Sequence, residues 1–173
     1  PWEARDHIHA IAQMLDASLG EIHDIARGLS PSELSPASFP SALGELARRV
    51  SASGPVECKF LHDGVSLPAD PAASSQLFQI AREAVANALR HAEPHRIDIE
   101  LAQTEEGIRL QVRDDGSGMA DPQGSEGMGL RIMRHRAELM GGTLTVGPGP
   151  GAGTLVACSL PLSPSGTAAG VRA

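Results

Sequence analysis

The chain has 173 residues and a mass of 18.0 kDa, which is enough for one compact domain, with or without a helical appendage. It carries 14 Lys and Arg against 21 Asp and Glu, a formal charge of -7, and it contains no basic block. This balance disfavours sequence-independent binding to nucleic acids or anionic membranes. Aromatic residues make up only 2%, which argues against a stacking platform for single-stranded bases and predicts an aliphatic core.

The two cysteines, Cys58 and Cys158, are far apart and lack both CxxC spacing and obvious ligand partners. A disulfide framework and a zinc site are therefore not indicated, and a reducing, cytoplasmic setting is expected. No apolar run approaches the ~20 residues of a membrane helix, so we expect no direct membrane contact from this chain, even if a longer protein is tethered. The chain begins with Pro1 rather than Met, which indicates a piece of a longer protein.

The first third of the chain predicts two helices and one strand. Apolar residues at helical spacing, uninterrupted by proline, predict a long amphipathic helix from Trp2 to Leu29. A proline-rich segment over 30–40 ends this helix, and residues 41–50 (SALGELARRV) predict a second, shorter one. Alternating residues from Pro55 to His62 predict a strand.

The middle of the chain predicts a further helix followed by a hairpin. Ser74 is expected to cap a helix that runs to about Ala92. The helix is predicted from a clean stripe of period 3.6, made of Leu77, Ile80, Ala81, Ala84, Val85, Ala88 and Leu89. Residues 96–103 and 107–113 alternate apolar and polar side chains around a short turn, as antiparallel strands do.

The last third predicts a loop, a helix and two strands. A loop with four glycines covers 116–128, and a helix over 129–140 ends at Gly141-Gly142. Residues 143–146 and 154–160 predict a last antiparallel pair, and 162–173 is expected to be a disordered tail. Hairpins in place of strict βαβ alternation predict an α+β two-layer sandwich, with a mixed, mostly antiparallel sheet covered by helices on one face.

Three polar residues follow one face of the helix predicted over 74–92. Glu83, Asn87 and His91 recur every four residues, so they lie beside the apolar stripe at the edge of the core. Such a row can face a ligand, although a row of this kind taken alone is more often a solvated face.

The stretch VRDDGSGM at 112–119 follows a predicted strand. A carboxylate at Asp114 can accept a hydrogen bond from an exocyclic amine, while Gly116 and Gly118 let the backbone approach a flat ring. Adenine has such an amine where guanine has a carbonyl, so Asp114 would reject guanine. An Asp-Gly turn without a ligand is the plainer interpretation of the stretch by itself.

Two further glycine-rich segments follow. GSEGMGL at 124–130 leads directly into a helix, where free N–H groups and the positive end of the helix dipole suit a polyphosphate. PGAGT at 150–154 places small residues before a strand. A flexible loop and a hairpin turn are the corresponding structural alternatives.

The order of these segments is far rarer than any one of them. The stretch from about Ser74 to Pro161 resembles the ATP-binding domain of the GHKL superfamily, which includes gyrase-type ATPases and histidine kinases. REAVANALRHA is similar to its N box, DDGSGM to its first glycine box, GMGL to its second and GAGT to its third. The segments EIHDIARGLSPSEL, SALGELARRV and GLRIMRHRAELMGG resemble two-component sensor histidine kinases of the nitrate/nitrite-sensor type.

The resemblance implies a Bergerat-type fold with ATP and Mg²⁺ as cofactors. By this resemblance Asn87 would place its amide oxygen on Mg²⁺ and Glu83 would orient metal-bound water, which makes them the catalytic candidates. Asp114 would bind the adenine amine. The other implied ATP-binding residues are Arg90, His91, Gly116, Gly118, Met119, Gly127, Met128, Gly129, Leu130, Gly151, Gly153 and Thr154.

The same resemblance implies the domain organisation. Residues 1–30 would be the end of a dimerisation hairpin, 31–161 the ATP-binding catalytic domain and 162–173 the tail. A histidine would be autophosphorylated and would pass its phosphoryl group to a response regulator, and the full-length protein would be a homodimer. His23 imitates the histidine-acid pair of the acceptor, but EIHDIARGL aligns better with the end of the second hairpin helix, so we expect the acceptor upstream.

One composition feature is independent of the resemblance. The only lysine is Lys59, so no GxxxxGK[ST] phosphate loop exists in this chain.

Two alternatives remain beside the histidine kinase. One is a GHKL serine kinase of the anti-sigma type, or an ATPase in which Glu83 activates water. The other is a partner-binding module with a vestigial nucleotide site.

Overall fold

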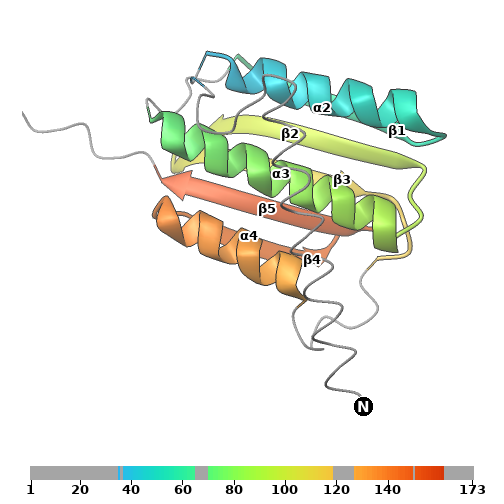
Figure 1. Cartoon of the computed structure of the whole chain (residues 1–173). Coiled ribbons are helices and arrows are strands. Elements are labelled where there is room, and N and C mark those ends of the chain that lie inside the picture. Colours follow the sequence, from blue (N-terminus) through green and yellow to red (C-terminus); the bar gives the residue numbers. More distant parts are fainter. Residues whose placement is uncertain (1–34, 36, 65–69, 119–126, 150, 162–173) are drawn as a thin grey trace, which may run out of the picture.

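The computed structural model describes residues 35, 37–64, 70–118, 127–149 and 151–161. These residues form three helices and five strands (Figure 1). In chain order the elements are α2 (Phe39–Ser53), β1 (Glu57–His62), α3 (Pro71–His91), β2 (Arg96–Thr104), β3 (Gly107–Asp114), α4 (Met128–Leu139), β4 (Thr143–Pro148) and β5 (Thr154–Pro161). The helix predicted over 2–29 and the tail predicted over 162–173 lie outside the described residues.

The five strands form one sheet in the order β1-β2-β3-β5-β4. β1 pairs parallel with β2, because α3 lies between them in the sequence and returns the chain across the sheet. The other three neighbouring pairs are antiparallel. The predicted α+β fold with a mixed, mostly antiparallel sheet is therefore confirmed.

All three helices cover the same face of the sheet, and α3 runs between α2 and α4 (Figure 1). Alternate residues of the strands point toward the helices, as in Ile97, Ile99 and Leu101 of β2, which are fully buried. The apolar stripe of α3 packs on them, and Met133 with Ala137 anchors α4. Burial of this aliphatic core holds α3 and α4 on the sheet.

The start of α3 differs from the prediction. The helix begins at Pro71, and its N-cap is Asp70, whose side chain accepts a hydrogen bond from the Ala72 amide at 2.9 Å. Ser74 was the wrong cap, since it lies one turn inside the helix, is fully buried and has no hydrogen-bond partner for its hydroxyl among the described residues. Proline at the first helical position explains the earlier start, because its fixed φ suits a helix and its missing N–H costs nothing there.

Leu89 belongs to the predicted apolar stripe of α3 but is not part of the buried core. It lies in the last turns of α3, and 43% of it is exposed, while the other predicted positions of the stripe are buried. Periodicity tells which face a residue shares, but it does not tell how far the neighbouring elements cover that face.

Cys58 and Cys158 are buried, free thiols. Burial raises the pKa of each to about 11, and at Cys58 the charge of Asp98 adds to this effect. The reactive thiolate form is therefore scarce at neutral pH at both positions. Within the described parts of the chain, no helix combines the length and the apolar character needed to cross a membrane.

Candidate nucleotide-binding site

A cavity of about 610 Å³ lies between α3 and α4, above the ends of β3, β4 and β5. This volume is in the range of small-molecule sites. Polar residues of α3 and the first turn of α4 line the cavity. Asp114, at the end of β3, lines it as well. Segments that are far apart in the sequence thus meet around one space.

The polar row of α3 faces this cavity. Glu83, Asn87 and His91 all line it, and so does Arg90. Nη2 of Arg90 donates to Oε1 of Glu83 at 3.1 Å and to Oδ1 of Asn87 at 3.0 Å. Two oxygen atoms of the row therefore converge on one cationic group.

Asp114 is buried at the end of β3, with 6% of it exposed. Its Oδ1 accepts hydrogen bonds from the Gly116 amide at 2.9 Å and from the Thr154 amide at 3.2 Å. These two donors fix the carboxylate against β5, and among the described residues no donor is assigned to Oδ2. Asp114 lines the cavity, so a ligand amine there could donate to the carboxylate.

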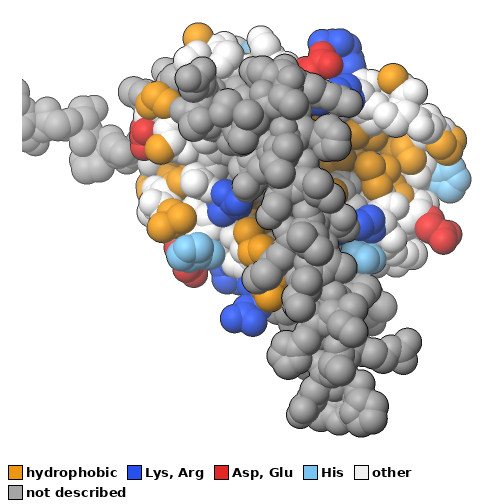
Figure 2. Space-filling view, in the orientation of Figure 1, with side chains coloured by type: hydrophobic (Ala, Val, Ile, Leu, Met, Phe, Trp, Pro, Cys, Tyr) orange, Lys and Arg blue, Asp and Glu red, His pale blue; other side chains and the backbone are white. Residues whose placement is uncertain are grey.

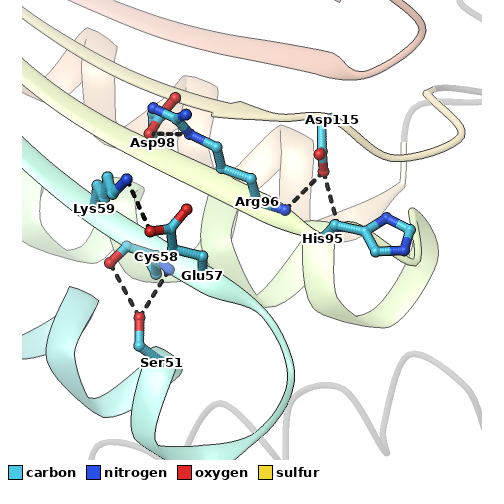
Figure 3. Close-up of polar contacts among 8 residues, drawn as sticks. All are labelled: Ser51, Glu57, Cys58, Lys59, His95, Arg96, Asp98 and Asp115. Carbon is cyan, nitrogen blue, oxygen red and sulfur yellow. Dashed lines mark hydrogen bonds and ion pairs between the residues drawn. The ribbon is translucent and has the colours of Figure 1, made fainter.

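The neighbouring acid, Asp115, has a different role (Figure 3). Its Oδ1 accepts hydrogen bonds from the amides of Arg96 and His95, both at 2.8 Å, at the start of β2. These bonds lower the pKa of Asp115, and the bond from the Arg96 amide has the largest effect. Burial acts in the opposite direction. Asp115 joins β3 to β2, and only Asp114 of the pair lines the cavity.

The N-terminus of α4 lies opposite the polar row of α3. Gly127 is the N-cap residue of α4, and no side chain accepts a hydrogen bond from the first amides of the helix. These amides bring the positive end of the helix dipole to the cavity. A Cβ built on Gly129 would lie 2.5 Å from Oε1 of Glu83 and 3.4 Å from Nδ2 of Asn87. The absence of a side chain at Gly129 thus lets α4 approach the acid and the amide of α3.

Three other expected glycines make contacts within the protein. A Cβ on Gly116 would lie 2.2 Å from the Ala92 carbonyl oxygen, and one on Gly118 would lie 2.3 Å from that of Ala152. A Cβ on Gly153 would lie 1.8 Å from the Asp114 carbonyl oxygen. These glycines therefore let loops pack against one another. Gly116 was expected to let a flat ring approach the backbone, but it does not line the cavity.

The structure brings most of the expected site residues together. The expected residues that line the cavity are Glu83, Asn87, Arg90, His91, Asp114, Gly118, Gly127, Met128, Gly129, Leu130 and Thr154. Gly116, Gly151 and Gly153 are not part of the lining, and Met119 and His23 lie outside the described residues.

With this geometry in place, comparison with known proteins identifies the family. The sequence model described as histidine kinase-, DNA gyrase B-, and HSP90-like ATPase matches residues 72–164, which is more than half of the chain. The chain belongs to this ATPase family. The match begins in the first turn of α3 and includes every element that lines the cavity.

Relatives in this ATPase family include sensor proteins. The chain is 39% identical to the nitrate/nitrite sensor protein NarQ of Escherichia coli over 132 residues, which are 73% of this chain and 23% of that protein. It is 30% identical to the sensor protein VraS of Staphylococcus saprophyticus over 157 residues, which are 90% of this chain and 45% of that protein. The chain thus spans less than half of the length of either relative.

A solved structure has the same fold. The ATP binding domain of PrrB from Mycobacterium tuberculosis superposes with a TM-score of 0.61 at 22% identity, and the match covers 73% of this chain and 95% of that chain. The arrangement of helices and sheet described above is therefore shared with that domain.

The apolar part of the site was not predicted from the sequence. Ala84 and Ala88 of α3, Ile132 of α4, and Val146 with Val156 of the β4–β5 pair all line the cavity. A flat ring between such side chains loses contact with water on both faces. Alternation in β4 and β5 could have indicated that Val146 and Val156 point inward, but apolar residues carry no signature that separates a binding pocket from a core.

The described residues include no group of three or more His, Cys, Asp or Glu that could hold a metal ion. The oxygen atoms of Glu83 and Asn87 are nevertheless of the kind that Mg²⁺ prefers, and they converge on one point. Such a pair suits a metal ion that takes its remaining ligands from water and from a nucleotide. In the part of this face that Figure 2 leaves uncovered, the described Lys and Arg side chains lie in separate groups.

Proposed function

We propose that this chain is the ATP-binding catalytic part of a sensor histidine kinase. One observation supports the proposal most directly. Asp114 lies buried at the end of β3 and lines the same cavity as the Glu83–Asn87 pair of α3 and the N-terminus of α4. An acceptor for an amine, an oxygen pair for a metal ion and the N-terminal amides of a helix are thus arranged around one space that is large enough for a nucleotide.

In this proposal the adenine lies against Val146 and Val156, and its amine donates to Asp114. The amide of Thr154 already donates to Oδ1 of Asp114, which aligns the carboxylate for this task. The phosphates lie toward the first turn of α4, where the amides and the dipole stabilise negative charge. Arg90 and His91 border the same region of the cavity.

Mg²⁺ is the second cofactor in this proposal. Asn87 would supply a neutral oxygen ligand and Glu83 would orient water bound to the metal. When bound, the ion would neutralise charge on the transferred phosphoryl group. The chain's own residues contribute position and charge, since phosphoryl transfer needs little covalent work from the protein.

The whole-protein activity extends this proposal. Residues 1–30 would end the dimerisation hairpin of a homodimer, 31–161 would form the catalytic domain, and 162–173 would be a tail. The phosphorylated histidine would lie upstream of this chain and would pass its phosphoryl group to a response regulator in the cytoplasm. Supporting evidence is the identity of 39% to a sensor protein over 132 residues.

Calorimetric titration tests the nucleotide site. The native chain and Asp114→Asn are titrated with Mg-ATP and with Mg-GTP. We expect the native chain to bind Mg-ATP and to bind Mg-GTP at least about tenfold more weakly, and we expect Asp114→Asn to lose affinity for Mg-ATP. A folded native chain that binds neither nucleotide would overturn the proposal and would favour a partner-binding module with a vestigial site.

A further inference from the structure

Arg90 folds back along its own helix over the polar row of α3. Its Nε donates to the Ala86 carbonyl oxygen at 3.2 Å, while Nη2 bridges Glu83 and Asn87. Three contacts thus hold the guanidinium in place. The position between the two side-chain oxygens is already filled by a cation that belongs to the chain.

This position bears directly on the metal site. Oδ1 of Asn87, which accepts from Arg90, is the atom that the proposed function assigns to Mg²⁺. A divalent ion on that oxygen would lie next to the guanidinium, and like charges at such short range repel strongly. The guanidinium and the metal ion therefore compete for Asn87 and for the charge of Glu83.

We propose that Arg90 acts as a tethered counter-cation, which holds the Glu83–Asn87 pair until nucleotide phosphates draw its guanidinium away. The site would then accept a metal ion together with a nucleotide and would bind the metal poorly by itself. This inference rests on the proposed function and goes beyond it, because it makes Arg90 a positioning residue that couples the two ligands.

The environment of Arg90 suits a group that must move. Its side chain is 42% exposed and that of Glu83 is 33% exposed, so solvent screens the ion pair and it contributes little to folding stability. Phosphate is a strong alternative partner, because a guanidinium can bind it through two parallel hydrogen bonds. Contacts with phosphate can therefore replace the contacts on α3 when a nucleotide binds.

Mn²⁺ tests the competition directly, because the free ion gives a paramagnetic resonance signal that is lost on binding, and it accepts oxygen ligands as Mg²⁺ does. The native chain, Arg90→Met and Arg90→Lys are titrated with Mn²⁺, first alone and then with ADP. Arg48→Met is the matched control, since Arg48 also pairs with a glutamate of its own helix, Glu45, but lies on α2 away from the cavity. Thermal melting checks that every variant is folded.

Without nucleotide we expect Arg90→Met to bind Mn²⁺ at least about tenfold more tightly than the native chain. Arg90→Lys and Arg48→Met should stay close to the native value, because the first keeps a charge at the site and the second changes a charge elsewhere. ADP should strengthen Mn²⁺ binding to the native chain more than it strengthens binding to Arg90→Met.

Two results would overturn the inference while the proposed function stands. In the first, Arg90→Met and the native chain bind Mn²⁺ with equal affinity. In the second, Arg48→Met gains as much Mn²⁺ affinity as Arg90→Met does. Both results count only if the native chain binds Mg-ADP in calorimetry. A native chain that binds neither Mg-ADP nor Mg-ATP would overturn the proposed function, and the inference with it.

Discussion

The backbone at Gly153 touches the backbone at Asp114 so closely that a Cβ on Gly153 would lie 1.8 Å from the Asp114 carbonyl oxygen. This contact joins the segment before β5 to the end of β3. It also explains how the Thr154 amide reaches Oδ1 of Asp114, since Thr154 is the next residue in the chain. The position of the carboxylate in the cavity thus depends on a glycine that does not itself line the cavity.

We therefore expect Gly153→Ala to destabilise the fold and to weaken nucleotide binding together. The added methyl meets main-chain atoms of Asp114, which cannot turn aside as a side chain can, so a loss of about 2–3 kcal/mol is expected. Urea unfolding and titration with Mg-ATP measure the two effects.

Gly147→Ala is the control for that experiment. Gly147 lies in β4, near the same turn, and a Cβ there would meet nothing within 4 Å. Its unfolding free energy should stay within about 0.5 kcal/mol of the native value. Equal losses in the two variants would show that the close contact with Asp114 is not what makes Gly153 necessary.

Gly129→Ala should separate stability from binding. The atom that its Cβ would meet, at 2.5 Å, is Oε1 of Glu83, at the end of a flexible side chain that can move. Alanine is also the better helix former, so stability should be unchanged or higher by up to about 1 kcal/mol. Displacement of Glu83 should nevertheless weaken Mg-ATP binding by about tenfold.

Gly127→Ala is the matched change for Gly129→Ala. Gly127 also lines the cavity, but a Cβ there would meet nothing within 4 Å. We expect its Mg-ATP affinity to stay within about threefold of the native value, a change of less than about 1 kcal/mol. If Gly129→Ala bound Mg-ATP as well as Gly127→Ala does, contact with Glu83 would have no part in binding.

The order and type of the elements could be predicted from the sequence because each has a strong local pattern. The stripe of α3 and the alternation in β2 and β3 are examples, and local turn residues marked most of the boundaries. The cap of α3 was missed because both Asp70 and Ser74 are good capping residues. The proline at position 71 was the local signal that favours Asp70.

Within the site, spacing could predict which residues share a face, but not which partners they meet. The sequence alone cannot separate the roles of Asp114 and Asp115, because the amides that bind Asp115 belong to residues 19 and 20 positions earlier. Packing of Gly116 on Ala92 likewise depends on the tertiary fold. Contacts of this kind follow from how β2, β3 and α3 are placed in three dimensions.

Asp115 should make the stability of the chain depend on acid pH. Its pKa in the folded chain lies below its ordinary value of 3.8, because the amides of Arg96 and His95 donate to the charged form. Its contribution is therefore present above about pH 4 and is lost as the pH falls through the lowered pKa. Asp115→Asn keeps an acceptor oxygen but has no charge, so it should be less stable than the native chain at pH 7.

Urea midpoints between pH 7 and pH 2.5 measure this effect. The difference between native chain and Asp115→Asn should shrink as the pH falls below 3.8. Asp63→Asn, at an exposed position after β1, serves as the surface control. A difference that stays constant over the whole range would show that the charge of Asp115 is not involved.

The start of α3 gives a last pair of opposite predictions. Asp70→Ala removes the acceptor for the Ala72 amide and should destabilise the chain by about 1 kcal/mol. Ser74→Ala removes a buried hydroxyl that has no partner among the described residues, so the variant should be as stable as the native chain or more stable. Thermal or urea unfolding of the two variants measures both effects. The reverse order of stabilities would mean that Ser74 caps the helix after all, and that α3 begins one turn later than the structure places it.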